Sequence, residues 1–159
     1  MANAVYPGSF DPITLGHCDI IRRIQKIFGR VTVLVSQSTQ KKYLFTAEER
    51  KKLIEGALEG VPNVKVEIHE GLTVDYVKQN NIQVIVRGLR LVSDFEYESV
   101  MANMNKKLYP GVETMIVFAS AEYYYVASTT VKEIAMHGGP IKDLVTPNVE
   151  AALKKKFTK

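Results

Sequence analysis

The residues best suited to chemistry lie in an early loop, which reads PGSFDPITLGH over residues 7–17. Gly8 permits a tight turn and a close approach of the backbone to a ligand. The Ser9 hydroxyl and the backbone of Ser9 and Phe10 can donate hydrogen bonds to phosphate oxygens. Gly16 leaves room at the start of a predicted helix, where unpaired N–H groups and the helix dipole favour an anion. The loop fits neither the Walker pattern nor G-x-G-x-x-G, yet it predicts a phosphate-binding segment.

His17 ends this loop, and two chemical roles are open to it. The ring can donate a hydrogen bond to a phosphoryl oxygen, or it can act as a base. A Gly-His pair after a strand is more often structural than functional. Here the order strand, loop, helix favours a functional histidine.

Two arginines flank a glycine at the end of a later strand, in the sequence Arg87-Gly-Leu-Arg90. Guanidinium groups can bind a phosphate through two hydrogen bonds at once. The alternative is a surface ion pair with Asp94, Glu96 or Glu98, and from this motif alone the two readings weigh equally.

Three further features are compatible with a nucleotide or with ordinary structure. Lys41 and Lys42 follow the second strand and can supply a mobile positive charge, although such pairs are usually solvated. The hydroxyls of residues 128–130, with the backbone N–H groups of residues 127–130, cap a helix or form a second phosphate site. The tyrosines at 123–125 line a base pocket, the core or an interface. His69 and His137 show no metal-binding spacing, so no metal-ligating residue is predicted. Cys18 is expected to pack in the core and not to act as a nucleophile.

Runs rich in Val and Ile alternate with amphipathic helical patterns along the chain. This alternation predicts an α/β fold, a doubly wound, Rossmann-like five-stranded parallel sheet with helices on both faces. Ligands in such folds lie beyond the carboxyl ends of the strands, which is where the motifs above fall. The expected strands cover residues 4–6, 31–35, 64–68, 84–87 and 115–119. The expected helices cover residues 20–28, 47–58, 74–79 and 95–108, with two more beginning near Thr130 and at Pro147.

Composition limits the class of protein. The 159 residues, 46% hydrophobic and 24% charged, fit one globular nucleotidyltransferase domain over residues 1–159. A net charge of +4 and a pI near 9.1 suit an anionic partner. However, the basic residues form no stripe interleaved with aromatics, so we expect no nucleic-acid partner. With no membrane span, no secretion signal and one cysteine, we expect a cytoplasmic protein without membrane association.

The sequence resembles the phosphopantetheine adenylyltransferases, the penultimate enzymes of bacterial coenzyme A synthesis, over essentially its whole length. The motifs that carry the resemblance are YPGSFDPITLGH at 6–17, FTAEER at 45–50, IVRGLR at 85–90, SDFEYE at 93–98, MNK at 104–106 and VKE at 131–133. The T-x-G-H form, in place of H-x-G-H, is typical of this branch of the nucleotidyltransferases. The family often has three serines where this chain has Ala127-Ser-Thr, so any contact from Ala127 must come from its backbone.

The resemblance implies the reversible transfer of AMP from ATP to 4′-phosphopantetheine, giving dephospho-CoA and pyrophosphate. It implies Mg²⁺ as cofactor, a homohexamer built as a dimer of trimers, and CoA as a candidate feedback ligand. His17, Lys41 and Arg90 are the expected catalytic residues. The acceptor would be held by Ser9, Lys41, Thr73 and Arg87. The nucleotide would be held by Ser9, Phe10, His17, Gly88, Leu89, Arg90, Glu98, Tyr123, Tyr124, Tyr125, Val126, Ala127, Ser128 and Thr129.

The acceptor is a phosphate that is already ionised at neutral pH, so no general base is needed. We therefore expect direct in-line attack on the α-phosphate of ATP, without a covalent enzyme intermediate. His17 is then expected to stabilise the transition state, and Lys41 to position the incoming phosphate. Two alternatives stay open: a nucleotidyltransferase with another acceptor, such as nicotinamide mononucleotide or glycerol phosphate, and a non-catalytic nucleotide- or RNA-binding module.

Overall fold

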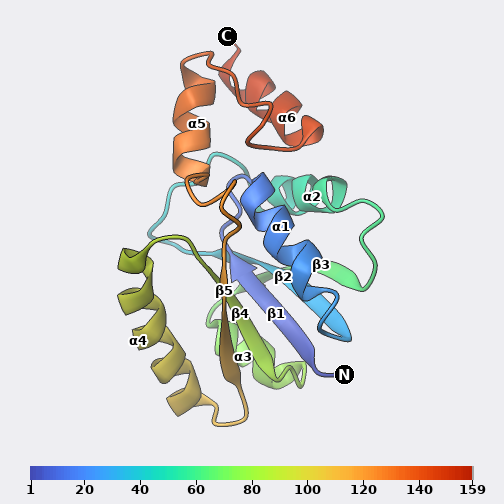
Figure 1. Cartoon of the computed structure of the whole chain (residues 1–159), viewed down its shortest axis with the longest axis vertical. Coiled ribbons are helices and arrows are strands. Elements are labelled where there is room, and N and C mark those ends of the chain that lie inside the picture. The colour runs from blue at the N-terminus through green and yellow to red at the C-terminus, as the bar shows by residue number, and fades with distance from the viewer. Residues whose placement is uncertain (159) are drawn as a thin grey trace.

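A computed structural model describes residues 1–158 of the chain, so that Lys159, the last residue of the predicted domain, lies outside the described residues. Five parallel strands form one sheet in the order β3-β2-β1-β4-β5 (Figure 1). This arrangement confirms the predicted Rossmann-like α/β fold. The strands are β1 (Asn3–Gly8), β2 (Arg30–Gln37), β3 (Val64–Glu70), β4 (Val84–Leu89) and β5 (Glu113–Phe118).

Six helices follow or connect these strands, and the predicted capping box of the second is present. The Thr46 hydroxyl accepts a hydrogen bond from the Glu49 backbone at 3.2 Å, and the Glu49 carboxylate accepts one from the Thr46 backbone at 2.8 Å. The helices are α1 (Leu15–Ile24), α2 (Ala47–Ala57), α3 (Thr73–Gln79), α4 (Val92–Leu108), α5 (Ser128–Met136) and α6 (Pro147–Phe157). Among the described residues, none of them is long and apolar enough to cross a bilayer.

Several helix boundaries differ from the predicted ones, and the largest difference is at the start of α1, which begins at Leu15 and not at 20. α4 begins at Val92 and not at 95, because the Asp94 carboxylate accepts a hydrogen bond from the Leu91 backbone and caps the extra turn. α1 ends at Ile24, since residues 25–27 continue only as turns although their side chains keep helical spacing. α5 begins at Ser128, two residues before the expected start near 130.

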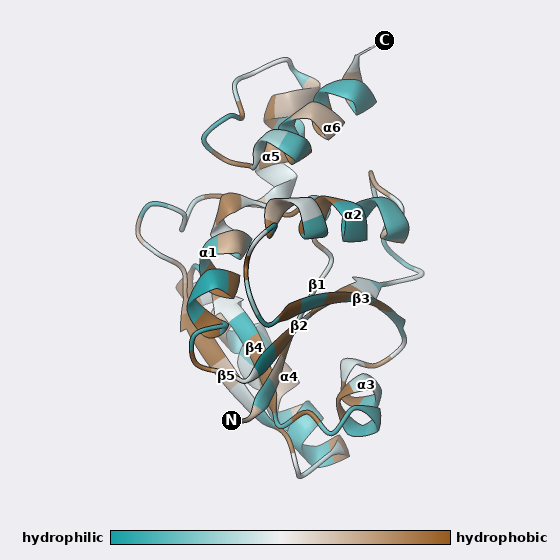
Figure 2. Cartoon of the chain, turned by 90° about the vertical axis from the view of Figure 1, so that its right-hand side faces the viewer, coloured by the Kyte–Doolittle hydropathy of each residue, from teal (hydrophilic) through white to brown (hydrophobic). Residues whose placement is uncertain are grey.

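The core lies on both faces of the sheet, because alternate strand residues point to opposite sides. Ala4 and Tyr6 of β1 pack with buried residues of α1, α2, α5 and α6, whereas Val5 packs with α3. The strands accordingly form the apolar centre of the molecule, with more polar helices outside (Figure 2).

The strand order reverses between β1 and β4, which are neighbours in the sheet although far apart in sequence. The segments that follow these two strands lead to α1 on one face and to α4 on the other (Figure 1). A crevice therefore opens at their carboxyl ends. The predicted phosphate loop and the predicted arginine pair both fall at this crevice.

Candidate active site

Two adjacent cavities lie at the carboxyl end of the sheet. The first has a volume of about 480 Å³ and lies between the segments after β1, β4 and β5. The second has a volume of about 310 Å³ and lies between the segments after β1 and β2, the start of α3, and α4. The two cavities share a wall, made of Pro7, Gly8, Ser9, Arg87, Tyr97 and Glu98.

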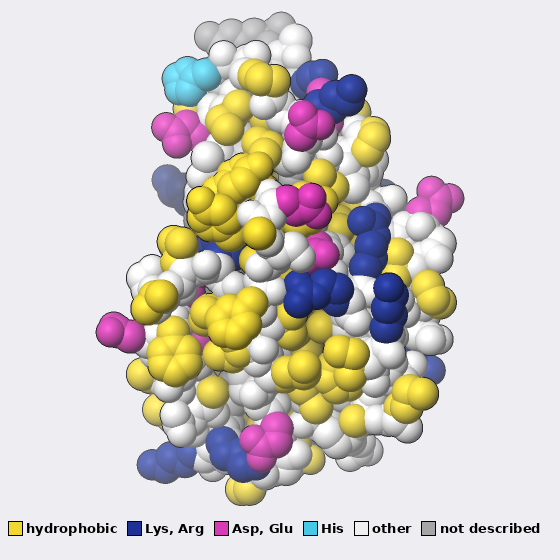
Figure 3. All heavy atoms as spheres, viewed as in Figure 1, with side chains coloured by type: hydrophobic (Ala, Val, Ile, Leu, Met, Phe, Trp, Pro, Cys, Tyr) yellow, Lys and Arg dark blue, Asp and Glu magenta, His cyan; other side chains and the backbone are white. Residues whose placement is uncertain are grey.

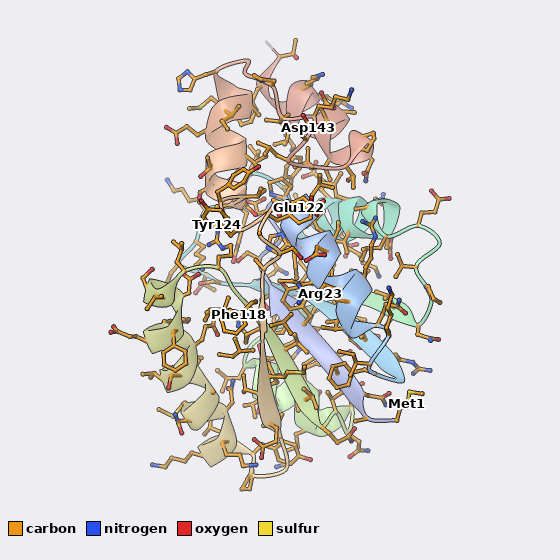
Figure 4. All side chains as sticks on the ribbon, viewed as in Figure 1. Met1, Arg23, Phe118, Glu122, Tyr124 and Asp143 are labelled. Atoms are coloured by element: carbon orange, nitrogen blue, oxygen red, sulfur yellow. The ribbon has the colours of Figure 1, made fainter. Side chains whose placement is uncertain are left out.

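Most residues predicted to hold the nucleotide line the first cavity. They are Ser9, Phe10, His17, Gly88, Arg90, Glu98, Tyr123, Val126, Ala127, Ser128 and Thr129. Leu89, Tyr124 and Tyr125 do not line it. Leu89 is buried, and the rings of Tyr124 and Tyr125 pack edge to face at the surface, where Figure 4 labels Tyr124. The geometry gives no support to a nucleotide contact from these three side chains.

The residues predicted to hold the acceptor, Ser9, Lys41, Thr73 and Arg87, all line the second cavity. His17 and Arg90 lie in the first cavity, so Lys41 approaches from the opposite side of the shared wall. The predicted catalytic residues therefore do not form one cluster. They flank Ser9, where groups bound in the two cavities would meet.

The protonation of His17 follows from its hydrogen bonds. Its Nδ1 accepts a hydrogen bond from the Thr14 backbone N–H at 3.1 Å and lies 3.0 Å from the Thr14 hydroxyl. A nitrogen that accepts from a backbone N–H carries no proton, so the neutral ring must carry its proton on Nε2. The edge-to-face contact with the Phe10 ring, 5.1 Å between centroids, fixes the orientation further. His17 can thus donate one hydrogen bond toward the first cavity.

The pKa of His17 is lowered from 6.5 to about 4, chiefly by burial and then by the positive charges of Arg90 and Arg87. The ring is therefore neutral at pH 7, which disfavours the role of acid and agrees with that of hydrogen-bond donor. As the pH falls, the unfolded chain takes up a proton first. The stability that neutral His17 contributes above pH 6.5 is consequently lost between about pH 6.5 and 4.

We expect the NMR resonances of the His17 ring to stay unchanged from pH 8 down to about pH 5, because its pKa lies near 4. The peaks are assigned by their disappearance in the His17→Asn variant. A titration midpoint near pH 6.5 for these peaks would show that burial and the two arginines do not lower the pKa of His17.

Arg87 forms an ion pair with Glu98, one of the three acidic residues that were the alternative to a phosphate as its partner. Its Nε and Nη2 donate to the two carboxylate oxygens of Glu98 at 2.8 and 2.7 Å, and its Nη1 donates to the Pro7 carbonyl at 2.7 Å. Burial alone lowers the pKa of Arg87, but the Glu98 carboxylate outweighs it and holds that pKa above its usual value. Glu98, predicted as a nucleotide contact, therefore fixes Arg87 at the shared wall. Arg90 takes part in no ion pair among residues 1–158 and stays available for an anion.

Two glycines of the motifs are closely packed, so that a side chain at either position would displace a neighbouring side chain. A Cβ at Gly88 would lie 2.6 Å from the Ile20 side chain and 3.1 Å from the Tyr6 hydroxyl. A Cβ at Gly8 would lie 3.0 Å from the Phe10 ring. The expected tight turn does not lie at Gly8, because Gly8 is the last residue of β1, and the positive φ of this loop, 47°, belongs to Phe10.

Sequence reasoning missed two residues that hold the site together, Thr14 and Asp11. Thr14 orients His17, and its position three residues earlier at the helix start is a capping-box spacing that could have revealed it. The buried Asp11 carboxylate accepts from the backbones of Leu44 and Phe45 and from Lys132, each at 2.9 Å. No local pattern indicates this link, because its partners lie 33, 34 and 121 residues away.

A second link fixes the segment after β5. Arg23 of α1 donates to the Phe118 carbonyl at 2.8 Å and to Asp19 at 3.0 Å (Figure 4). Asp19 in turn accepts a hydrogen bond from the Ser120 hydroxyl at 2.7 Å. Because Ala119 and Tyr123 line the first cavity, these contacts hold one of its walls against α1.

Residues 5–134 match the model of the cytidylyltransferase-like family. A solved structure with 18% sequence identity, a protein assigned as a nicotinate-nucleotide adenylyltransferase from Vibrio parahaemolyticus, superposes with a TM-score of 0.75 and covers 100% of this chain and 98% of that one. At this identity it shows the fold alone. The fold, the matched family and the cavity at the strand switch define a cytidylyltransferase-like nucleotidyltransferase.

Relatives of higher sequence identity define the family within this class. The chain is 60% identical over 156 residues to the phosphopantetheine adenylyltransferase of Bdellovibrio bacteriovorus, covering 98% of each. It is 53% identical to that of Thermotoga neapolitana, covering 97% and 96%, and 52% identical to that of Carboxydothermus hydrogenoformans, covering 100% and 98%. The chain belongs to the phosphopantetheine adenylyltransferase family.

Proposed function

We propose that this protein transfers AMP from ATP to 4′-phosphopantetheine, giving dephospho-CoA and pyrophosphate. The observation that carries the proposal is the pair of cavities that meet at Ser9 and Arg87. ATP would occupy the first cavity, beside His17 and Arg90. The acceptor would occupy the second, beside Lys41 and Thr73.

The acceptor phosphate would attack the α-phosphate in line, at the shared wall. A bond forms between an acceptor oxygen and the α-phosphorus, the bond to the bridging oxygen breaks, and pyrophosphate leaves with that oxygen. The main barrier is the approach of two anions, which positioned cations and donors lower. Lys41 and Arg87 would offset the charge of the acceptor. The proton on His17 Nε2 would stabilise charge on the reacting phosphate, with no covalent intermediate.

We also propose Mg²⁺ as the cofactor, which would be held mainly by the phosphates of ATP and would offset their negative charge. Among residues 1–158 no group of three or more His, Cys, Asp or Glu could hold a metal. The carboxylates lining the first cavity are already engaged, Glu98 with Arg87 and Asp94 with the backbone N–H of Arg90 and Leu91. A site with few protein ligands suits an ion carried by the nucleotide.

Pyrophosphate release from ATP tests the activity. We expect release with phosphopantetheine, and at least ten times less with nicotinamide mononucleotide or glycerol phosphate at equal concentration, a ratio that corresponds to about 1.4 kcal/mol. Preference for one of the other phosphates would replace the proposed acceptor, and no release with any of them would favour a binding module. Ping-pong kinetics or a trapped adenylyl-enzyme would exclude direct transfer.

We propose further that the protein forms a homohexamer, a dimer of trimers, and that α4 lies in a contact between copies. Glu98 is the only buried residue of this 17-residue helix. Its large apolar side chains are mostly exposed, among them Val92, Val100 and Met104, and Figure 3 shows hydrophobic side chains gathered on this face. Such a surface is unusual for a monomer.

Light scattering is expected to give six times the 17.8 kDa of the chain. Val100→Glu and Met104→Glu should each lower this mass, because a carboxylate would have to be buried at the contact. Ile27→Glu, an exposed position after α1, is the matched control and should keep the wild-type mass. A monomeric wild type, or hexameric α4 variants, would contradict the assignment of α4.

CoA contains the chemical parts of both substrates, and on this ground we propose that it competes for the same two cavities. Competition is measured as a rise in KM for both substrates in the presence of CoA. A cytoplasmic location and a single domain over residues 1–159 stay predictions.

A further inference from the structure

Arg50 is a fully buried cation behind the second cavity. It lies in the first turns of α2 with 0% of its surface exposed. Its Nη1 donates two hydrogen bonds to backbone carbonyls, to Ser9 at 2.6 Å and to Ser36 at 3.0 Å. Ser9 follows β1 and Ser36 lies near the end of β2, so a single guanidinium joins the ends of two neighbouring strands.

Arg50 also supports the segment that carries Lys41. Its guanidinium carbon lies 4.2 Å from the centre of the Tyr43 ring. The Tyr43 hydroxyl accepts a hydrogen bond from the Ser38 backbone at 2.9 Å, and the Lys41 backbone donates to the Ser38 carbonyl at 3.3 Å. Arg50 therefore contacts the residues at both ends of the segment 36–43.

Among the described residues, Arg50 has no close ion-pair partner, and the Asp11 carboxylate, which pairs with Lys132, favours its charge only from beyond ion-pair distance. Arg50 is absent from the ion pairs among residues 1–158, and its buried Nε has no hydrogen-bond partner there. Burial lowers the pKa of Arg50, but an arginine stays protonated in a protein. A buried cation is costly unless it is paired. Arg50 is held here by two carbonyl oxygens and the Tyr43 ring, so an anion bound in the adjacent second cavity would stabilise its charge further.

Ser9, Ser36 and Lys41 all line the second cavity. Carbonyl oxygens directed into this cavity would repel a phosphate, but those of Ser9 and Ser36 are engaged by Arg50. We propose that Arg50 is a positioning residue for the acceptor phosphate. It binds two carbonyl oxygens that would otherwise face the second cavity, and it fixes both ends of the segment that carries Lys41. Its charge also makes the electrostatic potential in that cavity more positive. This inference rests on the proposed binding of the acceptor in that cavity.

The test compares Arg50→Lys, which keeps the charge, with Arg50→Met, which removes it. Lys52→Met is the control, because Lys52 is exposed on the same helix and its loss changes the net charge equally. We expect both Arg50 variants to raise KM for phosphopantetheine about tenfold or more, with a much smaller change in KM for ATP. Arg50→Met should be the worse of the two, and Lys52→Met should match the wild type. Equal increases in both KM values, or wild-type kinetics, would overturn the proposal.

A double-mutant cycle with Lys41→Met separates positioning from general support of the fold. If Arg50 acts through the Lys41 segment, Arg50→Lys should have a much smaller effect on acceptor KM in the Lys41→Met background than in the wild type. Additive effects would overturn this route. If the Arg50 variants do not fold, Tyr43→Leu serves in their place, since it removes the ring beneath the guanidinium. It should raise acceptor KM selectively, and an unchanged acceptor KM would count against the proposal.

Assays of the wild-type enzyme distinguish a failure of the proposed function from a failure of the positioning role of Arg50. If it uses another phosphorylated acceptor, the proposed function fails, and the same comparison made with that acceptor decides the role of Arg50. If it uses phosphopantetheine but Arg50 variants show no selective change in KM, only the positioning role fails.

Discussion

His17→Ala is expected to lower kcat about 10²–10³-fold, the loss typical of a single donor to a charge that develops in the transition state. The neutral ring, held by Thr14 and Phe10, presents its proton on Nε2 to the first cavity. An interaction made mainly in the transition state lowers kcat and kcat/KM together and leaves KM for ATP nearly unchanged. Steady-state rates of pyrophosphate release measure all three.

His137→Ala is the matched control, because His137 is exposed after α5 and lines neither cavity. Thr14→Val should lose part of the same rate, since it removes the hydroxyl beside Nδ1 but keeps the backbone donor. Near-normal turnover of His17→Ala would exclude the ring from transition-state stabilisation.

The second large effect is expected for Glu98→Gln, which removes the charge that pairs with Arg87. Breaking one partner of a buried ion pair costs about 3 kcal/mol, because the other charge stays buried without compensation. Glu98 has 8% of its side chain exposed and Arg87 has 30%, so most of this cost should appear in the free energy of unfolding. Urea denaturation measures it.

The same substitution should also raise KM for both substrates, because Arg87 lies in the wall between the two cavities. Glu96→Gln is the control, since it removes an equal charge from an exposed position of the same helix. If Glu98→Gln is no less stable than this control, the pair does not hold α4 to the sheet.

The His17→Ala and Glu98→Gln variants test two different parts of the active site. His17 acts at the reacting phosphate, whereas Glu98 and Arg87 fix the wall at which the two substrates meet. Arg87 cannot release Glu98 without leaving a buried carboxylate, so we expect it to offer the acceptor positive potential from a fixed position. Lys41, which is exposed and extends from a surface segment, can instead move toward the phosphate.

The sequence alone determined the features that depend on near neighbours. The alternation of buried strands and helices predicted the parallel sheet, and Thr46 with Glu49 predicted the start of α2. The position of the loop at 7–17, at the carboxyl end of the first strand, was also predicted, whereas its binding of phosphate stays a prediction. These signals work because periodicity, capping and glycine content act over only a few residues.

Only the tertiary structure decided which residues meet across the chain. Sequence reasoning left Arg87 equally suited to a phosphate or to one of three acidic residues, and the packing of α4 selected Glu98. It included Tyr124 and Tyr125 with the nucleotide, but the segment after β5 turns them to the surface. It gave Arg50 no role, because the carbonyls it binds lie 41 and 14 residues away. Such choices depend on which backbone groups the fold brings within hydrogen-bond distance, and no local pattern encodes that.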